Sequence, residues 1–249
     1  MNSDGQSALV IKSPTGLEKA QLGANRIISG MVTDALALAR NGKVDAEASY
    51  QHGLKFYKNK EYLFAAKAFR EAAMLGHPAA QYHYGDMLSW GLRIEQDMPE
   101  GIKWLEKSAE QGHMKSQFEL GEIFYCYPDV AKSATQGQLA KSAMWYRKAA
   151  EQGHSFSQNH LAEMYQKGMG VPMDDVEAVK WHRQAAEQGN FKSQLELSTL
   201  YHQGLGVPQN DSESERWYQL ANESFPKEVK VRKFLGWSRE LGWSKELIK

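Results

Sequence analysis

Residues 149–154 read Ala-Ala-Glu-Gln-Gly-His, and this hexapeptide recurs along the chain with small changes. Related copies occupy residues 72–77, 108–113 and 185–190. Successive copies place their glycines 36, 41 and 36 residues apart, at Gly76, Gly112, Gly153 and Gly189. A period between about 20 and 50 residues is typical of a solenoid, whose units bury their apolar faces only against neighbouring units. The chain is therefore predicted to be a repeat protein.

Tryptophan keeps the same period, with spacings of 41, 36 and 36 residues between Trp104, Trp145, Trp181 and Trp217. Two residue types at one period strengthen the prediction of a repeat. In a solenoid, binding occurs along an extended surface. Function is therefore to be sought along that surface and not in a single pocket.

Residues 157–189 show what one unit contains. Apolar side chains at helical spacing predict a helix over residues 158–167, and Gly168-Met169-Gly170-Val171-Pro172 ends it. Asp174 or Asp175 can cap a second helix, which Gly189 terminates. Each unit is thus predicted to be an antiparallel helix pair.

Small residues recur where the two helices of a pair cross, because a bulky side chain there would push the axes beyond ~8–10 Å. One such column contains Gly85, Gly121, Ala162 and Ser198, and another contains Ala72, Ser108, Ala149 and Ala185.

These columns resemble the Sel-one-like repeat (SLR), a relative of the tetratricopeptide repeat, over about residues 63–223. The shared order is Gln-x-x-Leu-Gly/Ala-x-x-Tyr, Gly-x-Gly-Val-Pro and Ala-x-x-Trp-x-x-x-Ala-Ala-x-x-Gly. The first two units lack the Gly-Val-Pro loop, and Ser198 departs from the small column. The resemblance implies an all-α fold: a right-handed α-solenoid of antiparallel helix pairs with N- and C-terminal capping helices.

The expected organisation follows from where the repeat holds. Residues 1–13 are expected to be disordered, residues 14–43 to form a capping helix, and residues 44–75 a degenerate tetratricopeptide-like pair. Residues 76–223 form the repeat solenoid, and residues 224–249 a capping helix or basic tail. The tail duplicates Gly-Trp-Ser-Arg/Lys-Glu-Leu around Trp237 and Trp243, and residues 227–249 carry seven basic and three acidic side chains. These tryptophans either close the solenoid end or form a motif that docks a partner.

Composition limits the possible classes of partner. Thirty basic and thirty acidic side chains balance among 249 residues, so no general attraction to nucleic acid or anionic lipid is expected. No apolar run approaches membrane length, and the single Cys126 excludes an intramolecular disulfide. The N-terminus lacks a signal-like pattern. We expect a cytoplasmic protein, or a periplasmic one if a signal peptide has been removed.

In the related tetratricopeptide solenoids the first helix of each pair lines a concave groove. Carried onto this chain, that resemblance implies groove positions that vary between units while their neighbours repeat. We expect about half of the rings among them to be ordinary packing. The candidate partner-binding residues are Tyr50, Tyr57, Tyr82, Asp86, Trp90, Phe118, Glu122, Tyr125, Asn159, Glu163, Gln166, Leu195, Thr199 and His202.

Histidines and carboxylates offer a possible metal or acid–base site. His77, His113 and His154 follow the repeated glycine and are expected to be structural. Three i, i+3 pairs stand on successive first helices, where ~8–10 Å separates neighbouring helices: His83 with Asp86, Glu119 with Glu122, and His160 with Glu163. They would form a site only if their side chains converged, so we expect no metal, no cofactor and no catalytic residue.

The function expected is a non-enzymatic adaptor or scaffold that binds a protein or peptide segment in the concave groove. Aromatic side chains beside carboxylates suit a segment with apolar and basic or polar side chains. The resemblance leaves an alternative, an immunity protein that blocks a secreted bacterial effector enzyme such as a lipase. No small-molecule substrate, nucleic acid or membrane insertion is expected. An enzyme would need a buried titrating cluster.

Overall fold

The computed structural model describes residues 45–126 and 136–224, and these residues form ten α-helices. All pack as sequential antiparallel pairs, so the predicted all-α solenoid is confirmed. The helices are α2 Ala46–Lys58, α3 Tyr62–Met74, α4 Pro78–Trp90, α5 Met98–Glu110, α6 Met114–Cys126, α7 Gln136–Glu151, α8 Ser155–Lys167, α9 Asp175–Glu187, α10 Phe191–Gln203 and α11 Asp211–Ser224. The capping helix expected over 14–43 and the tail from residue 225 onward lie outside the described residues.

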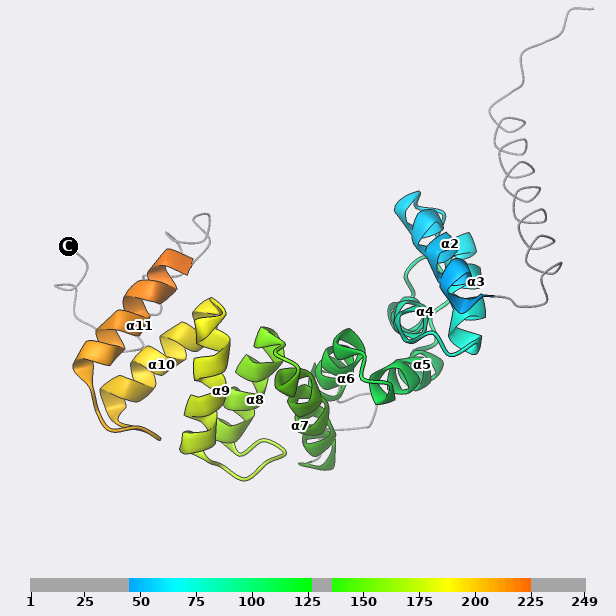
Figure 1. The fold of residues 1–249 in the computed structure, drawn as a ribbon. Coiled ribbons are helices and arrows are strands. Elements are labelled where there is room, and N and C mark those ends of the chain that lie inside the picture. Colours follow the sequence, from blue (N-terminus) through cyan, green and yellow to red (C-terminus); the bar gives the residue numbers. More distant parts are fainter. Residues whose placement is uncertain (1–44, 127–135, 225–249) are drawn as a thin grey trace, which may run out of the picture.

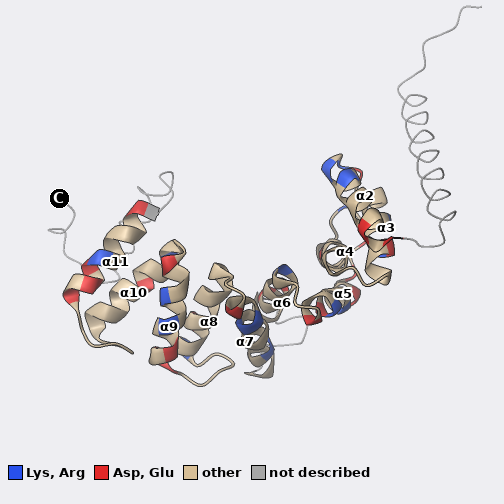
Figure 2. Ribbon diagram, viewed as in Figure 1, with Lys and Arg blue, Asp and Glu red and all other residues tan. Residues whose placement is uncertain are grey.

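The helix pairs follow one another along an arc (Figure 1). In the middle of the arc, α4 and α6 lie on its inner side and α5 and α7 on its outer side. The core is a series of clusters between helices: Leu105, Leu120 and Ile123 form one, and Tyr146, Leu161 and Met164 form the next. Lysine, arginine, aspartate and glutamate are interspersed along the arc (Figure 2).

The repeated hexapeptide builds the turn between units. Its glycine has a φ of 84–91° in all four copies, which favours glycine strongly over other residues. The residue after it caps the next helix, because His77, His113 and His154 each accept a backbone N–H at Nδ1 and Asn190 does so at Oδ1. The structural role expected for the three histidines is confirmed. These caps also explain why α8 begins at Ser155, three residues before the start predicted from apolar spacing.

Glutamines tie three consecutive helices together. A glutamine on each of α4, α6, α8 and α10 donates from Nε2 to a carbonyl of the preceding second helix, at 3.0–3.1 Å. Its Oε1 accepts from the glutamine of the hexapeptide, in the pairs Gln111–Gln81 at 2.7 Å, Gln152–Gln117 at 2.6 Å and Gln188–Gln158 at 2.7 Å. We call these bonds the glutamine ladder. Gln194 keeps the first bond, but its buried Oε1 has no hydrogen-bond partner.

The small columns have the predicted role at helix crossings. A Cβ at Gly85 would lie 2.9 Å from the carbonyl oxygen of Gly101, and one at Gly121 would overlap the ring of Tyr146. In the second column Ala72, Ser108, Ala149 and Ala185 are fully buried. Asp174, one of the two predicted caps, accepts the N–H of Glu177 at 3.0 Å.

Candidate functional site

The fourteen candidate residues described by the structure all lie on the first helices of the pairs, α2, α4, α6, α8 and α10. The two tail candidates, Trp237 and Trp243, lie outside the described residues. Two of these first helices, α4 and α6, lie on the inner side of the arc (Figure 1). The candidates therefore follow one side of the stack, but their environments differ.

Three aromatic candidates cover the histidine that caps the next unit. The ring of Tyr50 stacks on His77 with centroids 4.4 Å apart, Tyr82 lies 5.1 Å from His113, and Phe118 lies 4.6 Å from His154. All three aromatic rings are only partly exposed. They therefore contribute to packing between units and remain partly accessible at the surface.

Two further histidines stack on aromatic rings of second helices. His83 stacks on Phe69 of α3 with centroids 4.9 Å apart, and His160 stacks on Tyr146 of α7 at 5.1 Å. Burial lowers the pKa of His83 to about 4, and a nearby Lys115 acts in the same direction. His83 is therefore neutral at pH 7.

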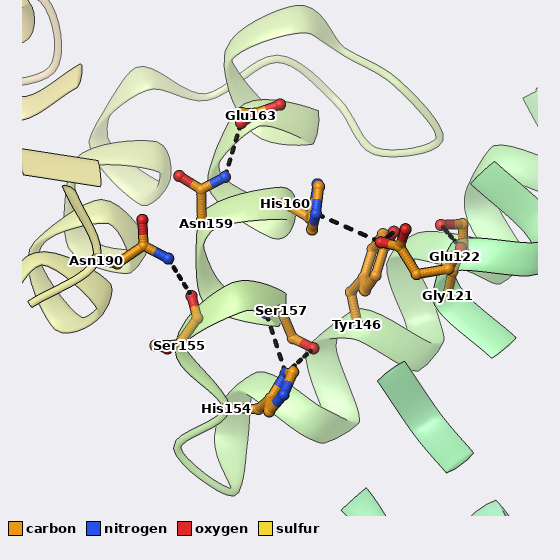
Figure 3. Close-up of polar contacts among 11 residues, drawn as sticks. Gly121, Glu122, Tyr146, His154, Ser155, Ser157, Asn159, His160, Glu163 and Asn190 are labelled. Carbon is orange, nitrogen blue, oxygen red and sulfur yellow. Dashed lines mark hydrogen bonds and ion pairs between the residues drawn. The ribbon is translucent and has the colours of Figure 1, made fainter. Parts of the chain in front are cut away.

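Part-buried carboxylates recur on the first helices α4, α6, α8 and α10. We call them the acidic stripe, and they are Asp86, Glu119, Glu122, Glu163 and Glu196. The indole of Trp90 donates to Glu119 at 2.9 Å, and the hydroxyl of Tyr146 donates to Glu122 at 2.5 Å. Asn159 donates to Glu163 at 2.7 Å. Figure 3 shows Tyr146 and His160 pointing toward Glu122 from neighbouring helices.

No ion pair of the described residues joins a carboxylate of the acidic stripe to lysine or arginine, although the charge of Lys167 lowers the pKa of Glu196. Burial, together with the charge of Glu119, raises the pKa of Asp86 to about 6. Burial also raises the pKa of Glu119 and of Glu196, and neighbouring carboxylates add to both. Among residues 45–126 and 136–224, the ion pair in the stripe joins His160 Nε2 to Glu122 Oε1 at 3.4 Å. The stripe is thus a set of hydrogen-bond acceptors, and Lys167 offsets part of the charge only at Glu196.

Several candidates are part of the scaffold. Asn159 is 2% exposed, because it bonds to Glu163 and accepts from Ser193 at 2.8 Å, so its predicted place on the surface of the groove is wrong. Gln166 hydrogen-bonds to the buried His182 at 3.1 Å. The remaining candidates are partly or fully exposed, and they are Tyr57, Tyr125, Leu195, Thr199 and His202.

The carboxylate and histidine pairs partly converge, contrary to the expectation that helix spacing keeps them apart. His160 from α8 reaches Glu122 from α6, since long side chains bridge neighbouring first helices. The described part of the chain nevertheless contains no group of three or more His, Cys, Asp or Glu side chains that could hold a metal ion.

Sequence reasoning missed Tyr146 and Glu196. Phe69, Leu105, Tyr146 and His182 occupy the same position of successive second helices. The change from apolar to polar side chains at this position was the sequence feature that could have indicated Tyr146.

Cys126 lies at the C-terminal end of α6 and is exposed. Burial of part of its side chain and the charge of Glu122 raise the pKa of the thiol. A raised pKa disfavours the thiolate, which is the nucleophilic form.

None of the described helices is both long enough and apolar enough to cross a membrane.

Comparisons with known proteins agree with this architecture. The Sel1 repeat family model matches residues 78–113, 115–154, 155–190 and 192–224. A similar solved structure is c5321, a protective antigen of uropathogenic Escherichia coli with an SLR fold, at 30% identity and a TM-score of 0.67, covering 82% of this chain and 43% of c5321. A Sel1 repeat protein from Oxalobacter formigenes is 27% identical with a TM-score of 0.66, covering 81% of this chain and 80% of that one.

A shorter match is to the sodium-type polar flagellar protein MotX of Vibrio parahaemolyticus, which is 36% identical over 53 residues. That match covers 21% of this chain and 25% of MotX. The chain therefore spans about a quarter of MotX and less than half of c5321.

Proposed function

The chain belongs to the Sel1 repeat family, and we propose that it is a non-enzymatic adaptor whose first helices bind a segment of another protein. Sel1 repeat proteins are generally non-catalytic binding modules. The finer proposal concerns where the segment binds and by which side chains.

The observation that supports this proposal is the acidic stripe, because no ion pair of the described residues joins its part-buried carboxylates to lysine or arginine. Keeping part-buried charges without a cation costs free energy in the unbound protein. A lysine or arginine of a bound segment would remove that cost. Nearby, the part-exposed rings of Tyr82 and Phe118 offer apolar contact area.

Preorganisation supports a binding role for the same residues. Glu119 is held by Trp90, Glu122 by Tyr146 and Glu163 by Asn159. Side chains that are already held in place lose little freedom when a ligand arrives. The rigid stack would therefore present a fixed spacing of carboxylates and rings to its partner.

Partner capture tests the proposal when it is done with near-isosteric charge variants. The test pair is Asp86→Asn with Glu163→Gln, which keeps side-chain shape and removes two stripe charges. The matched control is Glu151→Gln with Glu187→Gln, two exposed glutamates of the repeated hexapeptide. A protein captured by the wild type and the control pair, and lost with the test pair, supports the proposal. Equal capture by both pairs contradicts it.

The captured protein also distinguishes an adaptor from an inhibitor. If it is an enzyme that loses activity when bound one to one, the stripe serves inhibition. If the captured protein keeps its activity or has none, the adaptor role stands.

A further inference from the structure

The acidic stripe has a chemical counterpart within this chain. Residues 227–249 carry seven lysines and arginines and three glutamates, whereas residues 1–226 carry 23 basic and 27 acidic side chains. The same segment contains Trp237 and Trp243 in its duplicated sequence. Basic and aromatic side chains are the kinds that part-buried carboxylates and part-exposed rings would contact.

Repulsion within the stripe makes a cationic occupant favourable at two places. Glu119 acts on Asp86, Glu122 acts on Glu119, and Glu163 acts on Glu196, in each case disfavouring the ionised form. These interactions lie within and between α4 and α6, and between α8 and α10. A segment with several spaced positive charges would relieve the repulsion at both places, whereas a single cation would relieve it at one.

The segment is long enough to reach the middle of the stripe. It follows Ser224 at the end of α11, which packs directly on α10. Five helix-to-helix steps separate α11 from α6, a distance of at most about 50 Å at ~8–10 Å per step. Trp243 stands 19 residues after Ser224, and an extended chain of that length spans about 63 Å at ~3.3 Å per residue.

We propose that residues 225–249 occupy the acidic stripe of the same molecule and compete there with the external partner. The inference rests on the proposed function, because it assigns an occupant to the same surface. A tethered segment acts at an effective concentration of about a millimolar, so contacts with a dissociation constant below that value keep it bound in most molecules. A partner must then bring a stronger basic segment to displace it.

Cys126 provides a probe for this contact in the full-length chain. It is the single cysteine, it is exposed, and it lies beside Tyr125 and within the electrostatic influence of Glu122. A small fluorophore that tryptophan quenches on contact, such as bimane, can be attached to it. Replacing both tail tryptophans, Trp237→Phe with Trp243→Phe, should raise label emission about twofold or more, since the tethered tail is bound in most molecules.

Three comparisons make the result specific. Emission should also rise in about 1 M salt, where the screening length falls to ~3 Å. It should rise as well in the double variant Glu122→Gln with Glu163→Gln, which removes two charges of the stripe. The control Trp104→Phe, on the second helix α5, should leave emission unchanged. Equal emission in the wild type and the tail variant would overturn the inference. Quenching that grows with protein concentration would overturn it too, because the tail would then occupy a second copy.

The outcome is separable from that of the proposed function. Partner capture that depends on Asp86 and Glu163, with no quenching by the tail, removes this inference and leaves the binding role in place.

Discussion

Gln152 donates a hydrogen bond from Nε2 to Oε1 of Gln117 at 2.6 Å, and Gln117 in turn donates to the carbonyl oxygen of Ala109 at 3.0 Å. One side-chain pair therefore joins α5 and α6 to the turn that directly follows α7. The same relationship recurs in the neighbouring units. The glutamine of the repeated hexapeptide is thus a structural residue, and variable positions elsewhere carry the specificity.

Removing one ladder donor should destabilise the stack. Gln152→Ala leaves the buried Oε1 of Gln117 without a donor, which costs about 1–3 kcal/mol of unfolding free energy. Urea denaturation followed by circular dichroism measures the loss. The control Gln203→Ala removes an exposed glutamine from the end of α10 and should change stability little. Equal losses in the two variants would show that the ladder has no special role.

Completing the ladder at its last unit should stabilise the protein. Gln194 Oε1 is buried without a hydrogen-bond partner, and Ser224 stands 36 residues after Gln188, where a ladder glutamine would be expected. Ser224→Gln should raise the unfolding free energy by about 0.5–1.5 kcal/mol. The gain should vanish in a Gln194→Leu background, as a double-mutant cycle would show. A gain that persists there must come from another source.

The raised pKa of Asp86, about 6, predicts a pH-dependent effect of Asp86→Asn. Above pH 6 the folded wild type holds a charge that is more costly than in the unfolded chain, so the variant should be more stable by about 1–2 kcal/mol after allowance for solvent screening. As the pH falls from 6 to about 4, the folded wild type binds a proton before the unfolded chain does, and the difference should disappear. Thermal unfolding at pH 8 and pH 4.5 measures it. A difference independent of pH would contradict the burial of this charge.

His182 should act in the opposite direction. It is buried between Ser193 and Gln166, and burial lowers its pKa to about 3. Below pH 6.5 the unfolded chain gains a proton that the folded chain excludes. Relative to His182→Gln, the wild type should therefore lose about 1.4 kcal/mol per pH unit between pH 6.5 and about 4. Chemical denaturation at several pH values checks this slope, and parallel pH profiles would rule it out.

Sequence reasoning reached the fold because the period, the small columns and the turn glycines all act locally within a unit. Each of Gly76, Gly112, Gly153 and Gly189 specifies the same turn whatever surrounds it. The first residues of the helices were harder to predict, because the cap at His154 lies before the apolar spacing of α8 begins.

The candidate site was only partly predictable. The first helices were identified correctly, but the period does not say which variable side chains meet across units. Glu122 joins Tyr146 of the next helix and His160 of the next unit, and both contacts depend on how closely the curved stack brings its helices. Asn159 is buried because Ser193 of the following unit hydrogen-bonds to it, a contact that spacing alone does not reveal.

The most direct measurement of the central claim is the dissociation constant of the captured partner, determined by calorimetry for the full chain and its charge variants. If the acidic stripe binds a basic segment, the double variant Asp86→Asn with Glu163→Gln should weaken binding about tenfold or more. A tenfold change in the dissociation constant corresponds to about 1.4 kcal/mol of lost charge interaction. Glu151→Gln with Glu187→Gln should leave the constant unchanged. Equal constants for the two pairs would contradict a binding role for the stripe.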